Sequence, residues 1–332
     1  MDLAEFASVR PHEAITLLPA SGWKGMQWEG TVSFLGAASK TGKSWFELAK
    51  VQHSVLGKPF LGREMLPPST GDLRKALLLD FELPKGVFMS RWVALSGAFE
   101  EEERQVLFDP ARVCIECHRE NMKRPVDWIE YCCGRITDYC GPGDIASVDC
   151  LQPIMGDQDA NLSHVVRPIV ARFQAATTES GAMLDIVDHF NKGGEGTGMH
   201  RLSGSVAKSA GPDSILTLNG SQDGTIVVTA DLRMDPPVDD FHVQFEGYQF
   251  RVVTAEEMEE RKASIQAEKD AQQLHEMFPD GQWYEVKEIA MRIGLSEGGI
   301  QKRIDKNLER LERRKESRAY KYRWSNHSTS ET

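Results

Sequence analysis

Hydrophobic and polar positions follow two alternating periods along the first two thirds of the chain. Short apolar runs typical of buried strands are each followed by a longer segment with an apolar residue every three to four positions, which is typical of a helix. The predicted strand and helix pairs are 32–35 and 43–56, 75–80 and 86–97, 112–117 and 125–139, and 144–149 and 159–179, with a further strand at 182–187. This alternation predicts an α/β domain in which helices cover both faces of a mostly parallel sheet.

Three more strands follow without intervening helices, at 213–218, 225–232 and 241–250. We expect them to form an antiparallel extension of the sheet. A very polar helix is then predicted over 254–278, with Thr254 as its N-cap and Glu257 three residues later. The turn at 279–281 ends this helix, which we interpret as a connector.

The last part of the chain has a pattern of its own. A short amphipathic helix over 284–293 is followed by a turn, a second helix over 297–313 and an alternating basic hairpin that ends at Trp324. Helix, turn, helix and hairpin in this order predict a winged helix-turn-helix. The expected organisation is an α/β core, a helical connector, a winged helix-turn-helix-like domain and a disordered tail, with boundaries 1–252, 253–279, 280–325 and 326–332.

Composition and charge restrict the surroundings and partners of the protein. Hydrophobic residues make up 40% of the 332 positions, which is enough for a packed core. No apolar run approaches the ~20 residues that cross a bilayer, and the N-terminus lacks the layout of a signal peptide. We expect a cytoplasmic protein without membrane contact. The net charge is −11, yet residues 298–324 carry ten Lys/Arg and four Asp/Glu, so the last domain is the candidate for contact with nucleic acid.

The segment between the first predicted strand and its helix has the pattern of a phosphate-binding loop. Its residues are Ala37, Ala38, Ser39, Lys40, Thr41, Gly42, Lys43 and Ser44, with Trp45 next in the helix. Backbone N–H groups of such a loop bind phosphate oxygens, while Lys43 reaches the β- and γ-phosphates and the Ser44 hydroxyl binds Mg²⁺. Ala37 stands where the pattern has its first glycine, and Gly36 lies one place early. The alternative is a chance Gly-Lys-Ser match at a helix start, but the strand, turn and helix around it favour a nucleoside triphosphate site.

Acidic residues follow two of the other predicted strands. Asp149 ends the strand 144–149, and Asp80 and Glu82 lie at the end of the strand 75–80. Each would be a surface acid if it stood alone. In this order after a phosphate-binding loop, Asp149 becomes a candidate ligand of Mg²⁺. A carboxylate just beyond the second strand is a candidate for polarising the attacking water.

Four segments in chain order carry a family resemblance: Gly36–Trp45, Leu79–Glu82, Val148–Leu151 and Asp188–Gly193. They resemble the RecA-like AAA ATPases, and among them the group typified by the plasmid replicative helicase RepA, over roughly residues 20–250. The resemblance implies a RecA-like fold that binds ATP with Mg²⁺. It implies that Glu82 is the catalytic glutamate, that Asp149 is the Walker B aspartate and that His189 senses the γ-phosphate.

The same resemblance implies a homo-oligomer, expected to be a hexameric ring, with ATP between subunits and a cationic finger from the neighbour. Arg233 and Arg201 are the two candidates for this finger, because residues 211–213 replace the arginine that RepA-like proteins often carry there. The alternative for either arginine is a solvated side chain. In ring helicases a loop such as 189–205 faces the central channel, where we expect single-stranded DNA to meet Lys192, His200, Arg201 and Lys208.

Six cysteines leave a second kind of site open. The motif Cys114-x-x-Cys117-His118 is compatible with zinc. It falls in a predicted strand, however, where positions 114 and 117 point to opposite faces. Cys133 and Cys140 lie seven residues apart in a predicted helix and therefore share one face. The preferred interpretation is that the cysteines are small core residues.

The terminal domain offers side chains for duplex DNA. A recognition helix needs polar residues near its N-terminal end, and the predicted helix has Glu297, Gln301, Lys302 and Asp305 there, with Lys306 and Arg310 in reach of phosphates. The alternative is a winged helix used for protein contacts or ring packing.

These observations lead to one functional hypothesis and one alternative. The first is an ATP-hydrolysing protein that acts on nucleic acid, such as a helicase or replication-initiation ATPase of a mobile element. The alternative is a nucleotide-switched regulator or scaffold that binds DNA and has little turnover.

Overall fold

The computed structural model of the chain consists of two units that divide after Val253. The polar helix predicted as a connector belongs to the second unit by its contacts. Several expectations concern Ser39, the loop beyond His189, the turn 279–281 and the tail 326–332, which lie outside the described residues. The structure describes residues 21–38, 40–159, 162–189, 211–221, 224–233, 235–276, 282–316 and 319–324.

A nine-stranded sheet forms the centre of the first unit among the described residues, in the order β12-β11-β10-β9-β3-β8-β7-β5-β6. The strands β6, β5, β7, β8, β3 and β9 are parallel, and β9 to β12 pair antiparallel. Their bounds are β3 Val32–Ala37, β5 Ala76–Asp80, β6 Val113–Cys117, β7 Ile145–Asp149, β8 Met183–His189, β9 Ser214–Gly220, β10 Ile226–Leu232, β11 Phe241–Glu246 and β12 Gln249–Val252. The predicted mostly parallel sheet with an antiparallel extension is confirmed.

Two details of the extension differ from the prediction. The strand β9 joins β3 in parallel, so the antiparallel pairing starts one strand later. The predicted strand 241–250 is a hairpin, because the chain turns at Gly247 and Tyr248 with φ values of 55° and 61°. Alternating apolar residues continue through this turn, which explains why the pattern resembled one long strand.

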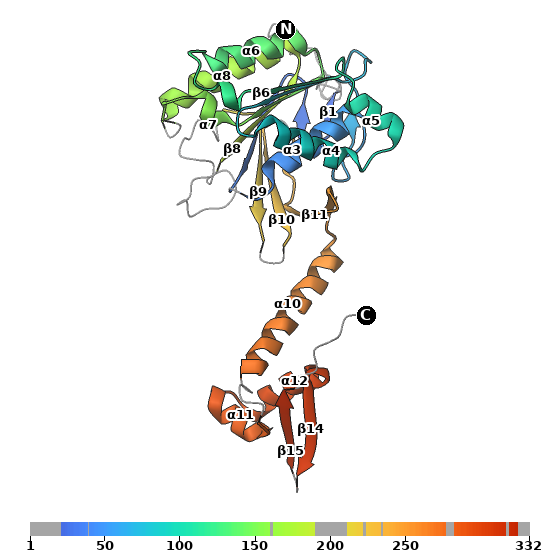
Figure 1. Cartoon of the computed structure of the whole chain (residues 1–332), viewed down its shortest axis with the longest axis vertical. Coiled ribbons are helices and arrows are strands. Elements are labelled where there is room, and N and C mark those ends of the chain that lie inside the picture. Colours follow the sequence, from blue (N-terminus) through green and yellow to red (C-terminus); the bar gives the residue numbers. More distant parts are fainter. Residues whose placement is uncertain are drawn as a thin grey trace, which may run out of the picture. The chain divides into compact units, whose positions relative to one another are not determined.

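Helices cover both faces of the sheet (Figure 1). One face carries α3 (Lys43–Val55), α4 (Lys85–Ser96) and α5 (Glu101–Leu107), and the other carries α6 (Trp128–Tyr139), α7 (Leu151–Ile154) and α8 (Ser163–Ser180). The strands between them are buried on both faces. In β5, for example, Leu78 packs with the α3 face, while Leu77 and Leu79 pack with the α6 face. This is why the parallel strands are continuous apolar runs in the sequence.

Smaller elements complete the first unit. A three-stranded sheet of β2, β1 and β4 lies outside the main sheet and was not predicted, because each strand has only two residues. The bounds are β1 Gly22–Trp23, β2 Gln27–Trp28, β4 Met65–Leu66 and a 3₁₀ turn at Arg119–Asn121.

A buried ion pair crosses from α3 to β8. Lys50 and Asp185 are each 1% exposed, and the Lys50 Nζ lies 2.7 Å from the Asp185 Oδ2. The Lys50 ammonium also donates to the Gln27 Oε1 at 2.6 Å. The neighbouring Glu47 is buried, and burial raises the pKa of its carboxyl group well above the usual range. The network joins the helix of the phosphate-binding loop to the strand that ends at His189.

The described residues of the second unit form three α-helices and a small sheet. The core of this unit is formed by Ile289, Ala290, Ile300, Ile304, Leu311 and Tyr322. The bounds are α10 Ala255–Glu276, β13 Tyr284–Glu285, α11 Val286–Ile293, α12 Glu297–Lys306, a 3₁₀ turn Leu308–Arg310, β14 Leu311–Glu316 and β15 Ala319–Trp324. None of the helices in the described parts of the chain is long and apolar enough to cross a membrane.

The Thr254 cap of this unit was predicted correctly, but one helix end was not. Thr254 and Glu257 form a reciprocal capping box, and the Ser296 hydroxyl accepts from the Gly299 N–H. The helix expected over 297–313 ends at Lys306. Leu311 fits the helical stripe in sequence, yet it starts β14 and pairs with Trp324. Tertiary pairing therefore overrides the local period.

Candidate nucleotide-hydrolysis site

The carboxyl ends of four parallel strands meet at one edge of the sheet. Asp80 at the end of β5 lies opposite Asp149 at the end of β7, which in turn lies opposite Val187 in β8. Ala37 at the end of β3 lies opposite His189 at the end of β8. Crevices at this edge of a parallel sheet are the usual ligand sites of such folds. The pairing register of the strands therefore brings Asp80, Asp149 and His189, which were predicted separately, to one edge of the sheet.

The loop from β3 to α3 presents free backbone donors. Lys40 and Gly42 have φ values of 66° and 96°, in the left-handed region, and they turn the chain so that α3 starts at Lys43. No side chain among the described residues caps this helix start. The first N–H groups of α3 are therefore open to an anion, and the helix dipole adds to the attraction.

Lys43 is held below this loop. Its side chain is buried, and the Nζ donates to the Ala37 carbonyl at 3.2 Å and lies 2.9 Å from the His189 Nδ1. Burial lowers the pKa of Lys43, while the nearby Asp149 and Glu82 carboxylates oppose this change. Since the ammonium can only donate, the His189 Nδ1 is the acceptor of this bond, and the Nε2 of the neutral imidazole carries the proton.

Ser44 and Asp149 form a pair suited to Mg²⁺. The Ser44 hydroxyl donates to the Asp149 Oδ2 at 2.8 Å. The Asp149 Oδ1 is buried and has no hydrogen-bond partner among the described residues. Burial raises the pKa of Asp149 to about 6, which is a cost that a cation would relieve. A hydroxyl and a buried carboxylate with an unused oxygen are the donors that Mg²⁺ prefers, so these residues fit the ion.

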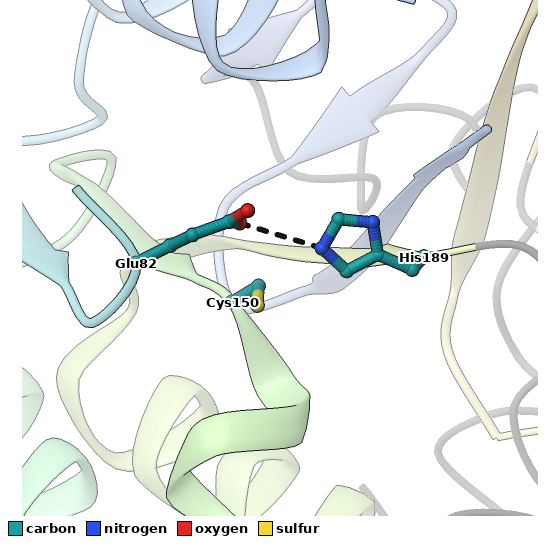
Figure 2. Close-up of side chains that lie close together, drawn as sticks. All are labelled: Glu82, Cys150 and His189. Atoms are coloured by element: carbon teal, nitrogen blue, oxygen red, sulfur yellow. Dashed lines mark ion pairs between the residues drawn. The ribbon is translucent and has the colours of Figure 1, made fainter. Parts of the chain in front are cut away.

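Glu82 faces His189 across the edge of the sheet. The Glu82 Oε2 lies 3.4 Å from the His189 Nε2 (Figure 2). A hydrogen bond from His189 lowers the pKa of Glu82, so the carboxylate stays ionised and able to accept a proton. Asp80 positions this loop, because its Oδ1 accepts from the N–H groups of Glu82 at 3.2 Å and Leu83 at 2.7 Å. Burial raises the pKa of Asp80 to about 7.

Lys43, Ser44, Glu82 and His189 line a cavity of about 410 Å³, and Asp149 lies behind Ser44. The walls of the cavity are Lys40, Gly42, Lys43, Ser44, Trp45, Glu82, Leu83, Arg91 and His189. Cavities of a few hundred Å³ accommodate small-molecule ligands. One edge therefore combines open N–H donors, a buried lysine, a candidate Mg²⁺ pair and an ionised carboxylate.

A model of the AAA domain family matches residues 4–195, more than half of the 332-residue chain. The chain belongs to the AAA domain family. Among solved structures, the ATPase domain of another protein is similar to 76% of this chain and to 98% of its own length, with 12% identity and a TM-score of 0.54. At this identity the similarity concerns the fold, and it confirms the RecA-like fold of this AAA domain. A search of curated proteins finds no match.

The sequence did not single out Arg91 of α4. The Arg91 Cζ lies 5.3 Å from the centre of the Trp45 ring, and Trp45 also packs on Phe245 at 5.2 Å and on Tyr248 at 5.5 Å. This wall of the cavity combines a cation with aromatic rings. Nothing in the local pattern of α4 marks Arg91, because only the packing of α4 on α3 brings it to the AAA domain cavity.

Arg233, one of the two finger candidates, is not at this cavity. Leu232 pairs with Ser214 at the start of β9, and Ser214 pairs with Ser33 near the start of β3. Arg233, the next residue, therefore lies at the opposite edge of the sheet from the cavity of its own AAA domain. Arg201 lies outside the described residues.

The cysteines of the sequence motif do not share a site. Cys114 packs on the α6 face of the sheet and Cys117 on the α3 face, so the two thiols cannot bind one metal ion. A different cysteine takes part in a potential metal group. The ligand atoms of Glu82, Cys150 and His189 all lie within 4.8 Å of one another.

Proposed function

We propose that the AAA domain hydrolyses ATP to ADP and phosphate at this cavity, and that the reaction is coupled to nucleic acid. The supporting observation is that Lys43, Ser44 and Glu82 line one cavity, and that the Ser44 hydroxyl is hydrogen-bonded to the buried Asp149. Phosphoryl transfer to water needs charge stabilisation and a positioned nucleophile more than covalent chemistry. These side chains supply both.

Glu82 orients the attacking water and takes up its proton. Its pKa is lowered by the hydrogen bond from His189, so it is ionised at neutral pH and suited to accept. Lys43 leaves the His189 Nδ1 when phosphate enters, because a phosphate oxygen is the stronger partner for an ammonium. His189 then keeps its contact with Glu82 but loses the one with Lys43. The position of His189 would therefore depend on whether a γ-phosphate is bound.

Ser44 and Asp149 would hold Mg²⁺ beside the phosphates. The ion would neutralise negative charge on the β- and γ-phosphate oxygens. The unpartnered Asp149 Oδ1 supports this role, since a buried carboxylate oxygen without a partner is costly. Arg91 and Trp45 form the part of the cavity wall that would contact the rest of the nucleotide.

The ring assembly is part of the proposal. A homo-oligomer, in its hexameric form, would place ATP between subunits and bring an arginine from the neighbour. Arg233 is compatible with this role only in trans, because it lies at the edge opposite its own cavity. Arg201 is the second candidate.

Two DNA contacts follow from the proposal. Single-stranded DNA would meet the loop after His189, with Lys192 as one contact. Duplex DNA would meet the second unit, as a winged helix-turn-helix, through Lys302 and Lys306 on α12, which form no ion pair among residues 282–316. The role would be that of a helicase or replication-initiation ATPase of a mobile element.

The test is the ATPase rate with and without single- and double-stranded DNA, measured beside the mass in solution with ATP. We expect turnover that single-stranded DNA stimulates, and a mass of several subunits. Lys192→Ala should lose most of the stimulation, while Lys262→Ala, on the exposed face of α10, should keep it. Turnover that does not respond to DNA would contradict the coupling.

The alternative is a nucleotide-controlled switch with little turnover. The observation in its favour is that His189 contacts both Lys43 and Glu82, so the two groups needed for hydrolysis are engaged before ATP arrives. A switch would retain ATP without forming ADP. A motor would release ADP continuously.

A further inference from the structure

Glu82, Cys150 and His189 come from the ends of three neighbouring strands and converge on one point. Glu82 lies two residues beyond β5, Cys150 directly follows β7, and His189 ends β8. Figure 2 shows the Cys150 sulfur next to the line that joins the Glu82 carboxylate and the His189 ring. Their ligand atoms lie within 4.8 Å of one another. A carboxylate, a thiol and an imidazole on three separate strands make a preformed set of metal donors.

The spacing of two of these donors matches a tetrahedral ion. Zinc binds imidazole nitrogen and carboxylate oxygen at about 2.1 Å, so two such ligands at a tetrahedral angle lie about 3.4 Å apart. The Glu82 Oε2 and the His189 Nε2 are 3.4 Å apart. The hydrogen bond from His189 to Glu82 is therefore at the long end of its usual range. This separation is the one expected for two zinc ligands.

The donor types distinguish this group from the adjacent Mg²⁺ pair. Mg²⁺ favours oxygen ligands, whereas thiolate and imidazole favour zinc and other soft ions. Ser44 and Asp149 offer only oxygen, and Cys150 offers sulfur one residue beyond Asp149. The two groups can therefore select different metals although they lie at the same edge of the sheet.

We infer that Glu82, Cys150 and His189 form a zinc site with an open fourth position, and that zinc bound there blocks the hydrolytic site. The ion enters through the cavity that Glu82 and His189 line. The Cys150 thiol gives its proton to water and binds as thiolate. The His189 proton moves from Nε2 to Nδ1, and Lys43 turns its ammonium to the Ala37 carbonyl, which it already contacts at 3.2 Å.

Inhibition follows from the ligands that zinc occupies. Glu82 can no longer take a proton from water when its carboxylate binds the ion, and His189 is fixed away from the γ-phosphate. This consequence rests on the proposed ATPase function. The zinc site itself does not, so binding is measured without nucleotide.

The direct experiment is calorimetric titration of the full chain with Zn²⁺ in the absence of nucleotide and Mg²⁺. Cys150→Ser should weaken one Zn²⁺ equivalent by at least about tenfold, because loss of even an outer contact of a metal ligand costs that much. Cys114→Ser is the matched control. Cys114 also lies near a glutamate, with its Sγ 3.7 Å from the Glu116 Oε1, but Glu116 is engaged by Arg135 and Tyr131.

Equal Zn²⁺ affinity in Cys150→Ser and the unmodified chain would overturn the inference, as would loss of the site in Cys114→Ser. If Cys150→Ser does not fold, the site is tested instead by adding Co²⁺ to the unmodified chain and to Cys114→Ser and recording their absorption spectra. Both should show a thiolate-to-cobalt charge-transfer band that Zn²⁺ removes. Absence of the band in either chain would contradict the site.

ATPase activity gives a separate readout. At fixed Mg²⁺ and ATP, Zn²⁺ should inhibit the unmodified chain, and Cys150→Ser should require at least about ten times more Zn²⁺ for the same fractional inhibition of its own rate. Equal sensitivity would overturn the inhibitory role. A chain that turns over no ATP would refute the proposed function, while the calorimetric result would still decide the zinc site.

Discussion

Among the described residues, the first unit has a fully buried ion pair in addition to exposed ones, whereas the ion pairs of the second unit are all at least partly exposed. In the AAA domain unit the Lys50–Asp185 pair is buried, with both side chains 1% exposed. In the second unit the Lys262–Glu259 pair on α10 has side chains that are 63% and 74% exposed. A buried charge depends on its ion-pair partner for stabilisation, whereas water solvates an exposed charge when its partner is removed. Lys50 and Asp185 therefore specify structure in the first unit, whereas Lys262 and Glu259 contribute mainly to solubility.

The difference extends to the functional surfaces. Asp80 and Asp149 in the first unit each have one buried oxygen without a hydrogen-bond partner among the described residues. In the second unit Arg314 pairs with Glu316, and both Arg314 and Arg323 pack on the Trp283 ring at 4.4 and 4.8 Å. The first unit thus keeps unsatisfied charge for a small cation. The hairpin of the second unit has already satisfied part of its charge.

Removal of the Lys50 charge should have the largest effect on stability. Lys50→Met leaves Asp185 buried and unpaired, and we expect a loss of about 3–5 kcal/mol in the free energy of unfolding. The matched change Lys262→Met should cost at most about 0.5 kcal/mol. Denaturant unfolding of both variants checks the prediction.

The double variant Lys50→Met/Asp185→Leu should recover much of this loss, since both charges are then absent. A Lys50→Met variant as stable as Lys262→Met would contradict the distinction between the two units.

The buried Asp80 should make stability depend on pH. Burial raises its pKa to about 7 in the folded chain, whereas an unfolded aspartate titrates near about 4. The folded state therefore binds the proton more tightly, and stability falls as pH rises between these values. Asp80→Asn keeps the acceptor for Glu82 N–H and removes the charge. The measured quantity is the melting temperature of Asp80→Asn minus that of the unmodified chain. We expect this difference to be larger at about pH 8 than at about pH 5, by on the order of 5 °C.

The same pair of pH values gives the control for Asp80→Asn. Asp305→Asn on the exposed face of α12 should shift the melting temperature equally at both. A constant shift for Asp80→Asn as well would show that the carboxyl group is already ionised at low pH.

The smallest effect concerns the salt dependence of duplex binding. If Lys306 contacts a phosphate, Lys306→Ala should make the slope of log affinity against log salt shallower by about 1. Arg314→Ala should change the slope less, because Glu316 already pairs with Arg314. Fluorescence anisotropy of labelled duplex at several salt concentrations measures both. Equal changes would mean that Arg314 releases Glu316 to bind DNA.

Local patterns predicted most of the core, and long-range pairing explains the errors. The boundaries of β3 and α3 follow from an apolar run and a helix start that are continuous in sequence. The helix α5 was missed because its segment begins with a run of glutamates from Glu100 and has little apolar pattern. Leu311 has the spacing of a helical residue, but its partner Trp324 lies on another strand.

The candidate site divides in the same way. Lys43 and Ser44 belong to one contiguous motif and can be predicted from it. Asp149 could be proposed because strand ends of a parallel sheet meet at one edge, whereas His189 was proposed only from the family resemblance. The contacts of Arg91 with Trp45, and of Cys150 with Glu82 and His189, depend on packing between distant segments, so no spacing in the sequence indicates them.

The central claim is that Glu82 takes part in hydrolysis at a cavity that binds ATP without it. The most direct measurement is ADP formation in a single turnover, beside ATP affinity, for Glu82→Gln and the unmodified chain. We predict retained ATP affinity and a rate lower by about 10²–10³-fold, the size of a lost contact made in the transition state. An unchanged rate with unchanged affinity would contradict the account.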